Sequence, residues 1–383
     1  MLRRANLVIL VLAIVAVPAL AAPEVKRFPA SSGGKLVLDL EAGGTVEISG
    51  SGGSGVEVAY SSECTPACEV SFEEGGRTLT IRTAFSKGAK QQNSNVELSI
   101  KVPSRFDVDV ASAGGGLSID GVEGRLAGKT SGGELTLRNV RGETELTTMG
   151  GEIKVVDCDL DGYLKTMGGA VTFENVVGDV RGSSMGGNVR YHNVRSRGGK
   201  PLSPERTGSD LGDLDPETVQ ISTMGGEINV EEAPEGADLH TMGGDIDVHG
   251  ARRFVRAKTM GGNIEIASID GWVQATTMGG NIDVNVTGQG GDVTLTSMSG
   301  DIVLSVPAGF GLDLDLEIAF TRNSGKDFKI VAPGSLKQSV TPEWDHDQGS
   351  PRKYIRMSGP VNGGGHAVKV RTVNGNIEVK QGA

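Results

Sequence analysis

The sequence predicts an all-β protein: a single-chain β-solenoid with 18-residue rungs, capped by β regions at its N-terminal and C-terminal ends. Two observations predict this fold class. A phrase of the form Thr-Met-Gly-Gly-x-Ile-x-Val recurs along the chain, and its second glycine returns with a constant period over long stretches. Polar and apolar residues alternate on both sides of each glycine pair. A fixed period indicates a repeat architecture, and period-two alternation indicates strands with one buried face.

Each repeat is expected to form one turn of a coil, which we call a rung. A repeat of this length provides two short strands and two turns and leaves no room for a crossover helix, so like strands must stack on one another. Ten stacked rungs would extend about 50 Å at the usual strand spacing. Eight clear copies begin at Thr148, Thr166, Ser184, Thr223, Thr241, Thr259, Thr277 and Ser297, and two weaker copies begin at Ser112 and Thr130.

The first residues have the layout of an export signal, and we assign residues 1–21 to a signal peptide. A positive start at Arg3 and Arg4 precedes an uncharged run, which ends in small residues at Ala19 and Ala21. This layout is typical of signal peptides, and the run is short for a membrane span. No second apolar run of spanning length follows, so we expect no transmembrane span in the mature chain.

The mature chain is expected to divide into three parts. Residues 22–102 contain short alternating segments separated by Gly and Ser, which predict a β region that caps the solenoid. Residues 103–305 hold the 18-residue repeats. Residues 306–383 predict a C-terminal β region, in which residues 366–379 form one closing rung. Caps are needed because an end rung otherwise exposes its apolar core and its strand edges.

One insertion interrupts the repeats at residues 195–216. The interval between the repeat glycines Gly187 and Gly226 is more than twice the usual period. The extra residues show no strand pattern and should form a long loop at one corner. Loops on rigid scaffolds often carry function, but insertions are also tolerated at solenoid corners, and we favour that second interpretation.

Two of the three cysteines predict a disulfide. Cys64 and Cys68 lie close together in the sequence, and an exported chain meets an oxidising compartment, so a small disulfide loop is the expected state. A metal pair is the alternative, although no other Cys or His motif lies nearby. Cys158 shares its register with Val140 and Val176, which predicts a buried apolar filler.

Methionine recurs at one position of the repeat and forms a candidate interaction stripe. Stacked rungs should align these residues in one column, for which we favour a packing role, with each side chain turned over the sheet edge. Two alternatives are an adaptable apolar surface for a partner and a thioether site for a soft ion such as Cu(I). The residues are Met149, Met167, Met185, Met224, Met242, Met260, Met278 and Met298.

Three polar columns should accompany the methionines. The Thr or Ser before each Met is expected to form hydrogen bonds along the stack. Asn or Asp at a turn tolerates a left-handed backbone and can form an amide ladder. The acidic column predicts a charged, solvated face, with Ca2+ binding as the alternative. The turn residues are Asn139, Asp157, Asn175 and Asn193, and the acidic residues are Glu227, Asp245, Asp247, Glu265, Asp283 and Asp301.

Composition limits the classes of function. The formal net charge is −11, with 48 acidic and 37 basic residues, which argues against nucleic acid and anionic lipid as partners. The five histidines form no metal-spaced pair, and the sequence lacks a serine nucleophile elbow and a phosphate loop. We therefore expect no enzyme activity and no cofactor.

The repeat phrase, the two Val-Pro-x-x-Phe segments at Val102 and Val306, and the closing Asn-Gly-Asn-Ile-Glu-Val at Asn374 carry a resemblance. Together they resemble the bacterial "putative adhesin" family of β-strand-repeat domains, over roughly residues 36–379. The resemblance implies an exported or cell-envelope protein without catalytic residues. The chain departs from that pattern by placing Met at a turn position that is usually small and polar, and by its insertion.

The expected function is therefore a binding or structural role, including adhesion, for an exported, non-enzymatic protein of the bacterial cell envelope. Its location would be the periplasm, the cell surface or the medium, and its partner would be an envelope or surface protein or glycan. One alternative is a carbohydrate-active β-helix enzyme, because some β-solenoids cleave polysaccharides. A second alternative is a periplasmic metal binder that uses the methionine stripe.

Overall fold

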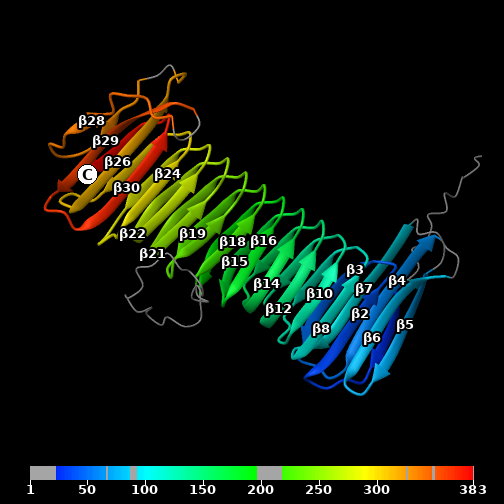
Figure 1. Cartoon of the computed structure of the whole chain (residues 1–383). Helices are drawn as coiled ribbons and strands as arrows, with labels where there is room; N and C mark the ends of the chain where they lie inside the picture. The colour runs from blue at the N-terminus through cyan, green and yellow to red at the C-terminus, as the bar shows by residue number, and fades with distance from the viewer. Residues whose placement is uncertain are drawn as a thin grey trace, which may run out of the picture.

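A computed structural model describes six segments of the chain, which build an elongated rod of strands (Figure 1). The predicted signal peptide lies outside the described residues, and so does the insertion apart from Arg195. Within the described residues the protein is all-β and has no helix, which confirms the predicted class. The described segments are 23–65, 68–86, 93–195, 218–324, 327–346 and 350–382.

Strand pairing forms two long ladders, and β21 and β22 contribute to both. The first ladder runs in spatial order through β5 (Cys68–Gly75), β6 (Thr78–Phe85), β2 (Gly34–Leu40), β8 (Phe106–Ser112), β10 (Leu126–Thr130), β12 (Arg141–Thr148), β14 (Asp159–Thr166), β16 (Val180–Ser184), β18 (Val219–Thr223), β20 (Ala237–His240), β21 (Ile246–Lys258), β22 (Ile264–Thr277), β24 (Val293–Ser297), β30 (His366–Val373), β26 (Leu312–Thr321), β29 (Arg352–Val361) and β28 (Gln338–Val340).

The second ladder lies behind the first and alternates with it along the chain. It runs through β1 (Glu24–Phe28), β4 (Val56–Thr65), β7 (Asn93–Pro103), β3 (Thr45–Ser51), β9 (Leu117–Asp120), β11 (Leu135–Arg138), β13 (Ile153–Val156), β15 (Val171–Val177), β17 (Val189–Arg195), β19 (Ile228–Ala233), β21, β22, β23 (Ile282–Val286), β25 (Ile302–Val306), β31 (Ile377–Gln381) and β27 (Ile330–Val331).

Pairing in the middle of both ladders is parallel and in register with the sequence repeat. In the first ladder Leu126 pairs with Thr144, which holds the equivalent position in the next repeat. In the second ladder Val171 pairs with Val189, again one repeat further along the chain. The next partner of Val189 is Ile228, beyond the insertion, so the ladder continues directly across it.

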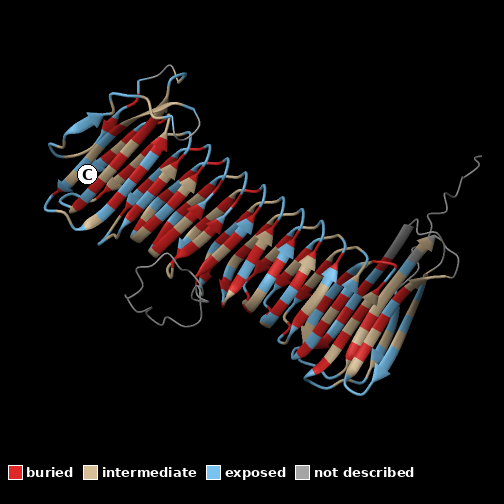
Figure 2. Ribbon diagram, viewed as in Figure 1, coloured by how far each residue is buried: buried red, intermediate tan, exposed pale blue. Residues whose placement is uncertain are grey.

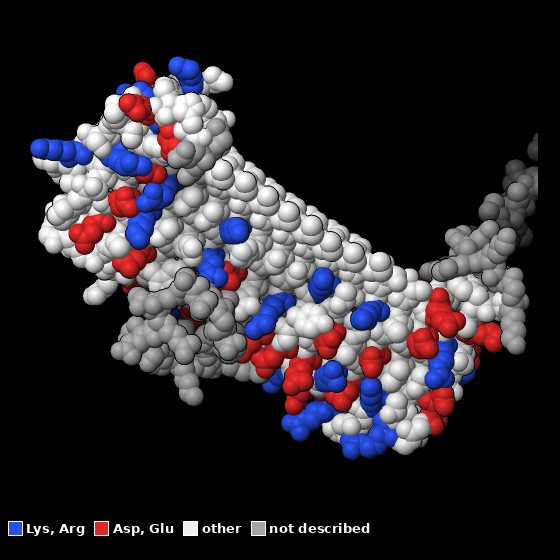
Figure 3. Space-filling view, viewed as in Figure 1, with Lys and Arg blue, Asp and Glu red and all other residues white. Residues whose placement is uncertain are grey.

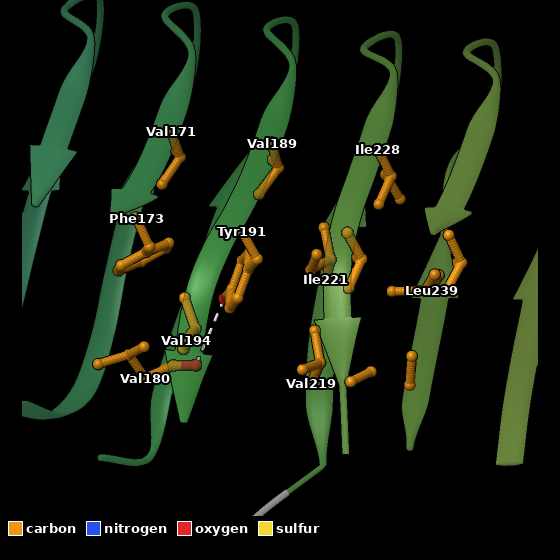
Figure 4. Close-up of a cluster of buried hydrophobic side chains, with 14 of the residues drawn as sticks. Val171, Phe173, Val180, Val189, Tyr191, Val194, Val219, Ile221, Ile228 and Leu239 are labelled. Carbon is orange, nitrogen blue, oxygen red and sulfur yellow. Dashed lines mark hydrogen bonds between the residues drawn. The ribbon is translucent and has the colours of Figure 1, made fainter. Parts of the chain in front are cut away.

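The core lies between the two ladders, because each strand buries every second side chain (Figure 2). Small aliphatic residues fill most of it, and one buried aromatic pair is Phe173 with Tyr191. The Tyr191 hydroxyl accepts a hydrogen bond from the Gly182 amide at 2.7 Å and donates to the Val180 carbonyl (Figure 4). Burial raises the pKa of Tyr191, so this hydroxyl stays neutral.

The N-terminal end contains a copy of the repeat that our sequence analysis missed. The segment Gly43-Gly44-Thr45-Val46 has the spacing of the repeat, and Val46 pairs in parallel with Leu117. On the other ladder Leu36 pairs in parallel with Val108. Antiparallel strands lie beyond this copy, since β4 pairs with β1 and β7, and β5 pairs with β6.

The C-terminal end is closed by a segment that returns to the repeats. Strand β30 pairs with β24, and β31 pairs with β25, although the whole segment 307–365 lies between β25 and β30 in the sequence. The intervening strand β26 therefore lies outside β30, where it also pairs with β29 in antiparallel fashion. The predicted rung at residues 366–379 thus stacks directly on the copy that begins at Ser297.

Candidate functional site: the methionine edge

The eight repeat methionines form one exposed column, which we call the methionine edge. Each follows a strand of the first ladder and precedes a glycine corner, and each of these residues is 37–54% exposed. The preceding Thr or Ser is buried. Strand alternation therefore continues through Met and points it outward, and the chain turns only at the glycines. We favoured a packing role with each side chain turned over the sheet edge, and the structure leaves each of these residues partly exposed.

The Thr or Ser before each methionine ties one repeat to the next through the backbone. The Thr166 hydroxyl donates to the Gly151 carbonyl of the preceding repeat at 2.8 Å. The same oxygen accepts from the Gly169 amide of its own corner at 3.2 Å. Ser184 makes both contacts as well. The predicted hydrogen bonding along the stack is confirmed, and the partners are backbone groups.

The second glycine of each pair is required by a close approach of backbones. A Cβ on Gly169 would overlap the carbonyl group of Gly151, and a Cβ on Gly151 would overlap that of Gly133. The first glycine is different, because a Cβ on Gly168 would meet its nearest atom only at 3.5 Å. Ser299 occupies this first position in the last copy, which agrees with the available space.

The surface around the methionine edge carries no charge on the face seen in Figure 3. The corners lie along the upper edge of the rod in that view, and this band holds no Lys, Arg, Asp or Glu. Charged side chains gather lower on the face and at both ends. On this face the methionine edge therefore borders a long, narrow band without charged side chains. Toward the second ladder the second glycine of the corner is followed directly by an acidic residue in four copies, at Glu152, Glu227, Asp245 and Asp301.

The predicted acidic column has two different parts. Asp245 accepts the backbone N–H of Asn263 in the next repeat at 2.6 Å, and Asp301 likewise accepts that of Asn376. Asp247 lies two residues further along the strand, where its in-register partner in the next repeat is Glu265. Burial, together with Glu227, Glu265 and Asp245, raises the pKa of Asp247 to about 6.

The corner opposite the methionine edge holds the predicted Asn and Asp ladder. Asn139, Asp157, Asn175 and Asn193 all have φ between 51° and 54°, which is the left-handed region. The Asn175 amide donates to the Asp157 carboxylate at 2.9 Å, and the Asn193 amide donates to the Asn175 side-chain oxygen at 2.7 Å. The predicted left-handed turns and amide ladder are confirmed.

The cysteines occupy two different environments. Cys64 and Cys68 form a disulfide between the end of β4 and the start of β5, with their Cα atoms 5.6 Å apart. Cys158 is buried beside Val140 and keeps a free thiol, and burial raises its pKa. The prediction that Cys158 is a buried filler is therefore confirmed.

A family model for Toastrack DUF4097 matches residues 34–380, which is most of the chain. The chain belongs to this family. Membership of Toastrack DUF4097 confirms the resemblance to a β-strand-repeat family that the sequence carries. The match begins at Gly34, where β2 opens the N-terminal copy of the repeat, and it ends within β31.

Solved structures with similarity to this Toastrack chain have low identity and low TM-scores. A "putative cell adhesion protein" from Clostridium sporogenes ATCC 15579 is 11% identical with a TM-score of 0.16, and covers 94% of this chain and 99% of its own. A "putative adhesin" from Bacteroides fragilis NCTC 9343 is 9% identical with a TM-score of 0.19, at 93% and 96% coverage. A "putative lipid binding protein" from Parabacteroides distasonis ATCC 8503 is 12% identical with a TM-score of 0.25, at 74% and 93% coverage.

No curated protein matches the sequence. In the part of the chain that the structure describes, no helix has the length and apolar character needed to cross a membrane.

Proposed function

We propose that this chain is an exported, non-enzymatic β-solenoid that binds a protein partner in the bacterial cell envelope through the methionine edge. One observation carries the proposal: eight methionines stand 37–54% exposed in one column, which borders an uncharged band on the face seen in Figure 3. Large contiguous apolar surfaces on soluble proteins mark interaction sites. An adhesive role of this kind agrees with the resemblance noted in the sequence.

The solenoid architecture is supported by the register of the two ladders. Parallel partners at equivalent positions of successive repeats mean that each repeat supplies one strand to each ladder. In this proposal residues 22–102 and 306–383 act as caps and residues 103–305 are the repeat body. The antiparallel strands β1, β4 and β5 at one end and β28 and β29 at the other would then protect the ends of the stack.

A protein fits the methionine edge better than a glycan does. Sugar binding commonly uses aromatic rings as flat platforms, and aromatic residues make up only 4% of this chain. Methionine side chains are flexible and adapt to irregular apolar surfaces, as in other Met-rich binding sites. The straight, narrow shape of the strip suits an extended or helical segment of a partner.

A catalytic role has less support than binding. Asp245 and Asp301 already accept backbone hydrogen bonds from the next repeat, so these carboxylates serve the stack. Asp247, which has the raised pKa, lies on the same open strand face as Glu265. A glycosidase needs two carboxylates on either side of a bound sugar, and neighbours in one column do not provide that arrangement.

Export is supported by two features of the chain. Residues 1–21 have the layout of a signal peptide. The disulfide between Cys64 and Cys68 is a bond that forms and persists in oxidising compartments.

Co-sedimentation of the purified mature chain with envelopes of the encoding bacterium tests the proposal. Changing Met185, Met224, Met242 and Met260 together to Gln keeps the side-chain length but makes the strip polar, and we expect at least a tenfold loss of binding. The same four changes to Leu preserve the apolar surface and should preserve binding. A control variant, Asn229→Gln with Asp283→Gln, alters the polar face of the second ladder and should bind normally.

Treatment of the envelopes identifies the partner class. Proteolysis of the envelopes should abolish binding, whereas digestion of their glycans should not. Equal co-sedimentation of the wild type and the Gln variant would contradict the proposed site, and loss of binding after glycan digestion alone would contradict the proposed protein partner.

A further inference from the structure

Four residues of the corner motif are nearly constant through the repeats, and two of them, the second glycine and the Thr or Ser, have a structural reason. The second glycine avoids a backbone clash, as at Gly169. The Thr or Ser hydroxyl links two repeats, as at Thr166. The methionine lies outside the core and is not needed to close the corner. Its constancy therefore requires another explanation.

Recent duplication does not provide that explanation, because neighbouring outward positions vary freely. The residue directly after the glycine pair is Glu152, Ala170, Asn188, Glu227, Asp245, Asn263, Asn281 or Asp301 in the same eight copies. Inward positions also exchange Ile, Val, Leu and Phe. An exposed apolar position under no other constraint would accept Leu, Ile or Val, yet all eight copies keep Met. Met differs from these residues in its unbranched, flexible chain and in its thioether sulfur, and of the two only the sulfur is a metal ligand.

The stack starts successive methionine side chains at a backbone spacing close to the one that a metal ion bridging two sulfurs needs. The Met167 amide donates to the Thr148 carbonyl of the previous repeat at 3.2 Å, and Met185 and Met298 make the same contact. Adjacent methionines therefore start about 4.8 Å apart, the spacing of paired strands. A bond from zinc to a cysteine sulfur is about 2.3 Å long, and on that scale an ion held linearly between two sulfurs separates them by about 4.6 Å.

We infer that the methionine edge binds soft monovalent cations, Cu(I) or Ag(I), between thioethers of successive repeats. Thioether sulfur is a soft, neutral ligand that selects Cu(I) over hard ions. Within the described residues, no group of three or more His, Cys, Asp and Glu side chains is placed to hold a metal. We therefore expect thioether sulfur to be the ligand at this site, and thioethers are poor ligands for hard divalent ions such as Ca2+.

The column has defined ends, which sets the expected stoichiometry. The position before Met149 in the stack is Ser131, and the position after Met298 is Val373, and neither side chain is a thioether. With two sulfurs for each ion, eight methionines hold about four ions. The inference uses the same eight side chains as the proposed function but does not depend on a protein partner.

Titration calorimetry with Ag(I) as the redox-inert probe tests the inference on the full mature chain. All variants carry Cys158→Val, which removes the free thiol and places the residue of Val140 and Val176 at this register. We expect about four Ag(I) ions per chain, and at least a tenfold loss of affinity when all eight methionines become Leu. Replacing Met357, which lies on β29 outside the column, by Leu should change nothing.

Two further measurements separate this inference from the proposed function. The Leu variant should keep envelope binding while it loses Ag(I), whereas a Gln variant should lose both. Oxidation of the methionines to sulfoxides should abolish Ag(I) binding, and methionine sulfoxide reductases should restore it. Equal Ag(I) binding by the wild type and the all-Leu variant, or binding of Zn2+ as tight as Ag(I), would overturn the inference.

Discussion

The two corners of each repeat are built on different principles. At the methionine edge every copy from Thr148 to Ser297 keeps nearly the same four residues, and backbones approach so closely that a side chain on the second glycine has no room. The opposite corner changes along the rod. Gly121 turns it in the copy that begins at Ser112, and Asn or Asp turns it in the next four copies, up to Asn193. Further along, β21 and β22 run through it as continuous strands.

This difference separates backbone contact from side-chain contact as determinants of a turn. A corner fixed by backbone contact accepts only glycine at the contact. The carbonyl group of one repeat lies where a side chain on the second glycine of the next repeat would have to be. A corner without such backbone contact accepts different local structures. In this chain it holds an amide ladder, a continuous strand or an insertion. The insertion at residues 195–216 enters at this second corner, directly after β17.

The largest loss of stability should follow from a substitution at the second glycine of the methionine edge. Gly169→Ala places a Cβ on backbone atoms of Gly151 and Glu152, which cannot move without shifting the stack. We expect the free energy of unfolding to fall by about 3 kcal/mol or more. Urea unfolding followed by circular dichroism measures the change.

The matched control is the neighbouring glycine. Gly168→Ala puts a Cβ in ordinary contact, at 3.5 Å from the nearest atom, and should change the free energy of unfolding by less than about 1 kcal/mol. Equal costs for the two substitutions would mean that backbone contact does not fix this corner.

A smaller loss is expected from the hydroxyl that links repeats. Thr166 is fully buried, and Thr166→Val keeps its shape but leaves the Gly169 amide and the Gly151 carbonyl without this partner. An unsatisfied buried polar group costs about 1–3 kcal/mol. Thr166→Ser keeps the hydroxyl, as Ser184 does in the next copy, and should retain most of the stability in the same urea assay.

The sequence was sufficient for the parts of the fold that follow from periodicity. The constant repeat spacing and the alternation predicted which side chains are buried, and the turn positions of Asn139 to Asn193 predicted left-handed residues. The copy at Gly43 was missed although it keeps Gly-Gly-x-Val-x-Ile, because a long stretch without the phrase separates it from the next copy at Ser112. Its partner strands come from distant parts of the chain, which a local pattern does not reveal.

The candidate site was predicted less well than the fold. The sequence identified all eight methionines, but we favoured packing because stacked methionines can satisfy one another along the rod. Whether Met167 is covered depends on where the chain turns, and the steric limit at Gly169 places the turn after Met rather than at it. That limit comes from the distance between two repeats, which the sequence of one repeat does not contain.

The opposite corner should tolerate substitution better than the methionine edge, and variants of Asn175 test this. Asn175→Ala places a residue that disfavours the left-handed region at a φ of 54° and removes two side-chain hydrogen bonds, so we expect a loss of about 1–2 kcal/mol. Asn175→Gly adopts the left-handed backbone without strain and loses only the hydrogen bonds of the amide ladder. It should therefore lower the free energy of unfolding by about half as much as Asn175→Ala. If Asn175→Ala proves as costly as Gly169→Ala in urea unfolding, the two corners do not differ in the way proposed here.

The smallest effect should come from charge on the strand face, at Asp247. Burial and nearby acids raise its pKa to about 6 in the folded state, above the ordinary value of 3.8. The folded protein therefore binds this proton more tightly than the unfolded chain, and stability falls as pH rises from about 4 to about 6. Asp247→Asn should remove this loss and stabilise the protein at pH 7, by about 1 kcal/mol at most because the group is partly exposed to solvent. Melting temperatures at pH 4.5 and pH 7 measure it, and a pH dependence that is the same in both proteins would assign the slope to other groups.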